Sequence, residues 1–170
     1  MHTFHQFAPP VLVLGVGNVL LGDDGAGPTL LREVKAWYSD VPAVECIDGG
    51  TLGMALLGYL AGREALIILD AFAAGSDPGT VSLLEGPESL NFRIINSATA
   101  HEGNAGELLA AAKLLDELPA QVFLIGIEPE RIRTELGLSE SVASAIPRAL
   151  VRTCGVVDRI LANLSGQVVA

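Results

Sequence analysis

The chain contains few cysteines, few aromatic residues and few basic residues, and each shortage excludes a class of protein. Its two cysteines, Cys46 and Cys154, are far apart and follow no metal-ligand spacing, so we expect two free thiols in a reducing cytoplasm. Aromatic residues make up 5% of the 170 residues, which predicts an aliphatic core. Ten basic against twenty acidic residues give a formal net charge of −10. This charge argues against binding to nucleic acid or to anionic membranes, because both need basic patches.

Long apolar runs are also missing. No run reaches the roughly 18 residues that a membrane-spanning helix needs, because Gly17, Asn18 and Asp23 interrupt the first candidate and Asp70 ends the second. The N-terminal segment MHTFHQFAPP lacks the charged start and apolar middle of a signal peptide. We therefore expect residues 1–9 to form a short flexible tail, and the protein to be cytoplasmic and not inserted in a membrane.

Segments of strand and helix character alternate along the chain, without an internal repeat or a linker. This alternation predicts one α/β domain over residues 1–170, a three-layer α/β/α arrangement around a twisted, mostly parallel five-stranded sheet. A short connection favours an antiparallel fourth strand, Ser139 is a candidate N-cap, and Pro147 predicts a kink or a late start of the last helix. The expected strands are 11–16, 43–47, 65–69, 80–84 and 120–127, and the expected helices are 28–38, 53–60, 107–118 and 139–164.

The segment 11–27, VLVLGVGNVLLGDDGAG, combines an apolar strand, a glycine-rich turn and the start of a helix. Such a turn often holds a phosphate at the helix N-terminus. Here Asp23 and Asp24 would repel a phosphate, and the G-x-G-x-x-G pattern lacks its last glycine, so nucleotide binding is the rival interpretation. The two carboxylates suit a cation better. We expect one of them, Asp23 rather than Asp24, to cap the following helix.

Three further polar residues fall near the ends of predicted strands or in loops beyond them. Asp48 follows the second strand, Asp70 ends the third, and His101 lies in the loop before the third helix. Ligands of open α/β sheets bind at the carboxyl ends of the strands, and carboxylates with an imidazole suit Zn, Ni, Mn or Fe(II). Asp48 is equally typical of an ordinary turn, and a lone histidine is more often structural. Asp70 needs a partner, because it ends a fully apolar run.

These segments, in this order and spacing, resemble a known family. The resemblance is carried by GVGNVLLGDDGAG, DGGTLGMALL from Asp48, ALIILDA ending at Ala71, the His101 loop, and LIGIEPERIRTELGLSESV from Leu124. They are similar to the hydrogenase maturation proteases, the endopeptidases that trim the C-terminus of a [NiFe]-hydrogenase large-subunit precursor. The match covers nearly the whole chain. It departs at Asn104-Ala105, where the family commonly has a Gly-Leu pair.

The resemblance implies that Asp24, Asp70 and His101 are the metal-contacting and catalytic residues. It implies that the metal is nickel already loaded into the precursor, so that the site of the free protein is empty or holds another divalent metal. The short C-terminal peptide would be cut only from a metal-loaded precursor. The sequence itself has no G-x-S-x-G elbow, no H-E-x-x-H helix and no plausible Cys–His pair, which favours metal-assisted hydrolysis.

Two expectations concern the partner. We expect Asp48, Gly49, Gly50 and Thr51 to shape the substrate cleft, because glycines let a backbone approach closely. The alternative to a protease is a non-catalytic chaperone that binds nickel-loaded hydrogenase without cutting it. In either case the expected partner is the large-subunit precursor, and we expect the protein itself to be a monomer.

Overall fold

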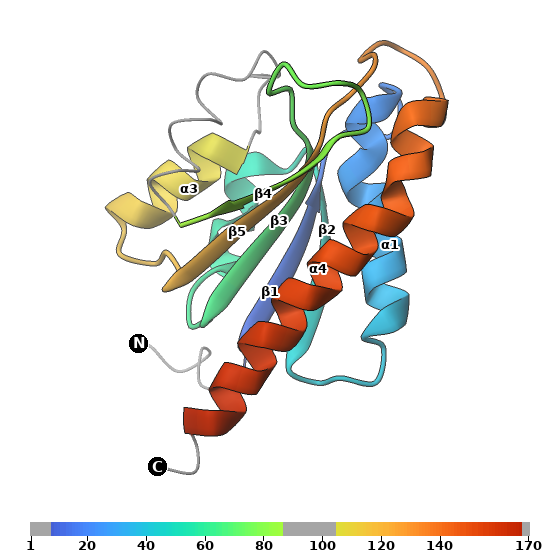
Figure 1. Ribbon diagram of the computed structural model, residues 1–170. Coiled ribbons are helices and arrows are strands. Elements are labelled where there is room, and N and C mark those ends of the chain that lie inside the picture. The colour runs from blue at the N-terminus through green and yellow to red at the C-terminus, as the bar shows by residue number, and fades with distance from the viewer. Residues whose placement is uncertain (1–7, 87–104, 168–170) are drawn as a thin grey trace.

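One five-stranded sheet forms the centre of the computed structural model, which describes residues 8–86 and 105–167 (Figure 1). The strands lie in the order β2-β1-β3-β5-β4. All neighbouring pairs are parallel except β4 and β5, which are antiparallel. The strands are β1 (Val11–Val16), β2 (Val44–Gly50), β3 (Ala65–Ala71), β4 (Val81–Glu85) and β5 (Gln121–Ile127).

Helices cover both faces of this sheet (Figure 1). Two long α-helices pack on one face, and a 3-10 helix and a short α-helix pack on the other. A second 3-10 turn connects the end of β1 to the first long helix. The elements are η2 (Asp23–Gly25), α1 (Ala26–Trp37), η3 (Gly53–Tyr59), α3 (Ala105–Leu114) and α4 (Glu140–Gln167), with α1 and α4 sharing a face.

The central strands are apolar along their whole length because both of their faces are covered. In β1, Val11 and Val13 point toward α1 and α4, whereas Leu12 and Leu14 point toward η3 and α3, and all four are fully buried. Strands of parallel sheets that are covered on both faces read as continuous Val, Ile and Leu runs instead of alternating ones. The aliphatic composition thus supplies the core on both sides of the sheet.

The structure confirms the predicted class, with a mostly parallel five-stranded sheet between helices and an antiparallel β4. It corrects several boundaries. β2 continues to Gly50 and β3 to Ala71, so Asp48 and Asp70 lie inside strands and not after them. The expected helix at 53–60 is the 3-10 helix η3. The loop that carries His101 falls on residues 87–104, outside the described residues.

The last helix begins where Ser139 predicts. The N–H of Val142 donates to the Ser139 hydroxyl at 3.3 Å, which confirms Ser139 as the N-cap of α4. The helix then runs from Glu140 through Pro147 without a break, so the late start is wrong. No described helix is long and apolar enough to cross a membrane.

Both cysteines are free and half-buried, as expected. Most of the expected tail, residues 1–7, lies outside the described residues, while the Pro9 carbonyl accepts a hydrogen bond from Arg63 at 2.7 Å.

Candidate functional site

Asp24 is held in place by the turn that carries it. The Asn18 N–H donates to Asp24 Oδ2 at 2.8 Å, and the Asn18 side-chain oxygen accepts from the Leu20 N–H at 3.0 Å. Asp24 is half-buried, and in the described part of the chain no hydrogen bond engages its Oδ1. One carboxylate oxygen therefore fixes the orientation of the side chain, and the other remains available to a ligand.

Asp70 lies near the carboxyl end of β3, where it pairs in register with Gly126. Burial raises the pKa of Asp70 well above its usual value, and the negative charge of Asp24 raises it further, while the Ala71 amide opposes the change. The two carboxylates are therefore close enough for their charges to interact. Two carboxylates that share a site repel each other, and a cation between them removes that cost. The donor set at this end of the sheet fits a divalent metal.

A close helix–sheet contact at Gly27 brings the two aspartates together. A Cβ atom at Gly27 would lie 2.2 Å from the Val16 carbonyl oxygen and 2.3 Å from the Leu69 carbonyl oxygen. Only glycine fits there, because such contacts are far shorter than van der Waals separation. The start of α1 can therefore lie directly between the ends of β1 and β3. This contact places the turn with Asp24 beside the strand end with Asp70.

Asp23 has a different role from the one predicted. Neither η2 nor α1 has a side-chain cap, so the expected cap of the following helix is wrong. The fully buried Asp23 carboxylate accepts from the N–H groups of Glu130, Arg131 and Ser139 at 2.9, 3.0 and 2.6 Å, and from the Ser139 hydroxyl at 2.9 Å. It thereby ties the Asp24 turn to the loop before α4.

The electrostatics of Asp23 follow from these partners. Burial by itself would raise the pKa of Asp23, but the hydrogen bonds from Arg131, Ser139 and Glu130 lower it, and the net shift is downward. The carboxylate is thus ionised and fully satisfied, without a free position for a metal. Local sequence gave no signal of this anchoring role, because the partners lie more than one hundred residues away.

A cavity of about 420 Å³ adjoins the turn that carries Asp24. Asp48 and Arg32 supply its charged groups, and the Asp48 carboxylate also accepts from the Gly50 N–H at 3.0 Å. Gly49, Gly50 and Thr51, which were also expected in the cleft, are not among the described residues that line this cavity. The remaining lining residues are small or apolar: Val19, Gly22, Gly25, Pro28, Thr29, Leu136, Gly137 and Leu138.

The expected third ligand, His101, lies outside the described residues. Within the ranges 8–86 and 105–167, no group of three His, Cys, Asp or Glu side chains is arranged to hold a metal ion. The structure therefore brings Asp24 and Asp70 together and leaves the position of His101 a prediction.

The chain is similar to known proteins of one family. A family model described as "Hydrogenase maturation protease" matches residues 28–155. The hydrogenase 2 maturation protease of Escherichia coli strain K12 is 36% identical over 141 residues, which cover 82% of this chain and 85% of that protein.

Solved structures agree with the sequence comparison. The hydrogenase maturating endopeptidase HybD from E. coli is similar, with a TM-score of 0.78, 33% identity, and coverage of 88% of this chain and 92% of that one. The [NiFe] hydrogenase maturation protease HybD from Thermococcus kodakarensis gives a TM-score of 0.68, 26% identity, and coverage of 86% and 97%. By sequence and by fold, this chain belongs to the hydrogenase maturation proteases, the endopeptidases that process the C-terminus of the [NiFe]-hydrogenase large subunit.

Proposed function

We propose that the protein removes a short C-terminal peptide from a [NiFe]-hydrogenase large-subunit precursor, and that it acts only after nickel has been loaded into that precursor. The observation that carries this proposal is the pair formed by Asp24 and Asp70, two interacting carboxylates at the carboxyl edge of the sheet. Burial and the negative charge of Asp24 raise the pKa of Asp70, and a bound cation would favour the ionised carboxylate of Asp70. Nickel arrives as part of the substrate, and Asp24, Asp70 and His101 contact it.

The reaction is hydrolysis of one peptide bond. A divalent ion acts as a Lewis acid, either on the scissile carbonyl or on a water molecule. Asp24 and Asp70 orient the substrate through their contact with its nickel, and a carboxylate oxygen at this edge accepts a proton from the attacking water. The water oxygen adds to the carbonyl carbon, the C–N bond breaks, and the released amine takes up a proton. The cavity that Asp48 lines lies beside this centre and suits the polypeptide on one side of the cut.

Cleavage by single-residue variants tests the assigned residues. We expect Asp24→Asn, Asp70→Asn and His101→Ala to remain folded by circular dichroism and to leave the nickel-loaded precursor at its full intact mass. Asp40→Asn removes the same charge from an exposed position with no role in the site, and this matched control should cut as the wild type does. If two of the three site variants retained cleavage, the metal-contact assignment would be wrong. A precursor that binds the wild type without any change in mass would indicate the chaperone alternative.

A further inference from the structure

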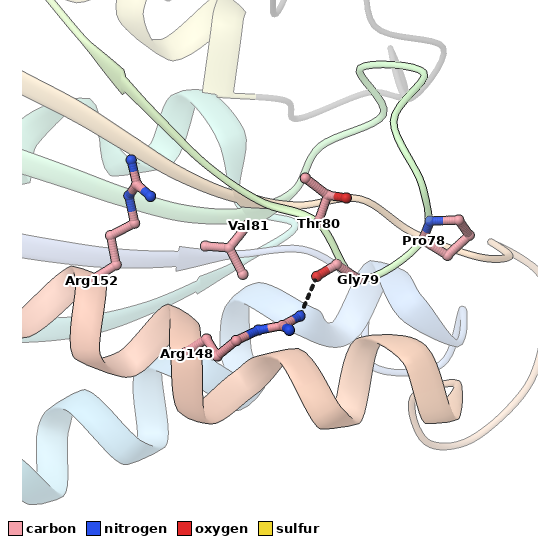
Figure 2. A pocket seen from close by; sticks show the side chains of 6 residues that line it. All are labelled: Pro78, Gly79, Thr80, Val81, Arg148 and Arg152. Carbon is pink, nitrogen blue, oxygen red and sulfur yellow. Dashed lines mark hydrogen bonds between the residues drawn. The ribbon is translucent and has the colours of Figure 1, made fainter.

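A second cavity lies between α4 and the start of β4, apart from the Asp24 turn and the Asp48 cleft (Figure 2). Its volume is about 420 Å³. Residues 78–81 form one wall, and Arg148 and Arg152 of α4 form the other. Among the residues that the structure describes, no carboxylate side chain lines it. The cavity thus presents positive charge in a protein whose formal net charge is −10.

No carboxylate of the described residues pairs with the two arginines of this cavity. Arg148 donates to the Gly79 carbonyl oxygen at 3.0 Å, which is an uncharged acceptor (Figure 2). Arg152 makes no hydrogen bond or ion pair within the part of the chain that the structure describes. The two residues are one helical turn apart on α4, where like charges repel. In contrast, Arg159 on the same helix pairs with Glu85 at 2.9 Å.

The wall opposite the arginines is fixed before any ligand arrives. Gly79 has a φ of +80°, and a Cβ atom there would lie 2.4 Å from the Ser141 carbonyl oxygen, so the turn packs directly on the first turn of α4. The Gly79 N–H donates to the Glu128 carbonyl at 2.8 Å, and the Thr80 hydroxyl donates to the Asp77 carbonyl at 2.6 Å. A preformed wall lowers the entropy that a ligand must lose on binding.

We propose that this cavity binds an oxyanion, a carboxylate or phosphate group, through the guanidinium groups of Arg148 and Arg152. Guanidinium groups present a planar fork of N–H donors that matches two oxygens of such a group. The volume falls within the range of about 300–1,000 Å³ that is typical of small-molecule sites. An anion bound between the two guanidinium groups would also relieve the repulsion between them.

The position of the cavity allows two sources of this oxyanion. Val81 pairs with Ile127, and Asp70 pairs with Gly126, so the cavity lies at the same sheet edge as the candidate metal centre with β5 between them. Neighbouring strands are about 4.8 Å apart, so a carboxylate carried by the precursor and a free small anion are the two sources to be tested. Only the first source rests on the proposed protease function.

Binding is tested on the free protein, without cleavage. Inorganic phosphate and succinate are titrated at constant ionic strength set with sodium chloride, and the amide resonances of residues 79–81 are followed. Saturable shifts are expected with phosphate, with succinate or with both. Arg152→Gln should weaken the binding of that anion about 10-fold or more, because a charge-assisted hydrogen bond is lost. Arg159→Gln removes the same charge from the same helix and should bind as the wild type does. Shifts that do not saturate, or equal weakening in both variants, would overturn the proposal.

The source of the anion is tested separately, with the nickel-loaded precursor. If the precursor carries the oxyanion, Arg152→Gln raises KM about 10-fold with kcat unchanged, and phosphate competes with the precursor. If the ligand is a free anion, KM is the same for Arg152→Gln and wild type. Should the precursor not be cut by any form of the protein, the proposed function fails, and the titration alone still decides whether the oxyanion site exists.

Discussion

Asp23 and Asp24 are neighbours in the chain, yet their carboxylates serve different purposes. Asp23 is fully buried and accepts four hydrogen bonds from Glu130, Arg131 and Ser139. Asp24 is half-buried, and from the described residues it accepts one hydrogen bond, from the Asn18 N–H. Asp23 is therefore a positioning residue, which fastens the turn that presents Asp24 to the candidate metal centre. Asp23 was expected to have a structural role as a helix cap, but its actual partners could not be predicted, because they come from the far end of the chain.

Substitution of Asp23 tests this anchoring role. Asp23→Asn keeps the shape of the side chain but turns an amide NH₂ toward backbone N–H donors, which leaves buried groups unsatisfied. We expect the free energy of unfolding to fall by about 3 kcal/mol, measured by urea denaturation. Asp40→Asn, at an exposed position, is the control and should change stability by less than about 0.5 kcal/mol. A loss of less than 1 kcal/mol at Asp23 would contradict the anchoring role.

We expect the Cys46 thiol to react slowly at neutral pH, because its pKa is raised. Burial raises the pKa of Cys46 to about 11, from an ordinary value of 9.0, and Glu45 adds to the rise while Lys35 opposes it. The raised pKa means that the reactive thiolate is scarce below pH 11. At pH 8 the thiolate fraction is about 100-fold lower than for an unperturbed thiol.

The measurement uses Cys154→Ala, so that Cys46 is the one remaining thiol. Its rate of modification by a thiol reagent should rise about tenfold for each pH unit between 8 and 10, without levelling off. A plateau near pH 9 would show that the thiol is not perturbed. Inert thiols agree with a protease that uses neither cysteine as a nucleophile.

Among the secondary-structure elements, those with a clear apolar pattern were predictable, and the exact ends of strands were not. The apolar runs at 11–16 and 65–69 were recognisable as strands because a strand covered on both faces must be apolar throughout. The ends of β2 and β3 were missed. Asp48 and Gly49 look like turn residues, but the parallel ladder with β1 extends through Asp48, and a register shift then pairs Val16 with Gly50.

We expect substitution of two glycines by alanine to change stability in opposite directions, because one glycine lies at the close contact of α1 with the sheet and the other does not. Gly27→Ala would place a Cβ atom 2.2 Å from the Val16 carbonyl oxygen, so α1 and the Asp24 turn must move. We expect a loss of stability of about 1–3 kcal/mol and a fall in precursor cleavage of about 100-fold, since small displacements of reacting groups are costly.

Gly155→Ala is the matched control for that change. Gly155 lies within α4, and a Cβ atom there would meet nothing within 4 Å. Because alanine favours the helix and restricts the unfolded chain, this variant should be more stable by about 0.5–1 kcal/mol and should cut normally. If the two substitutions had equal effects on stability and on cleavage, the close contact of α1 with the sheet at Gly27 would not explain how Asp24 is positioned.

At the scale of the whole molecule, the order of the strands brings residues that are distant in sequence to the same end of the sheet. Parallel strands end at one edge, and Asp24 and Asp70 follow or end adjacent strands, so their approach could be predicted from the order of strands and helices. Asp48 was expected in a cleft and lines one of the two cavities, but the other walls of both cavities could not be predicted. Each is formed by segments that are distant in sequence, such as 78–81 with Arg148 and Arg152.

The central proposal is that the protein recognises nickel bound in the precursor. Comparing cleavage of the precursor with and without nickel tests this proposal most directly. The matching large-subunit precursor is prepared with and without nickel, each form is mixed with the protein, and the intact mass of the precursor is followed over time. We expect the nickel-loaded form to lose the mass of one C-terminal peptide, while the nickel-free form keeps its full mass. Equally fast cleavage of the nickel-free form would show that nickel is not what the protein recognises.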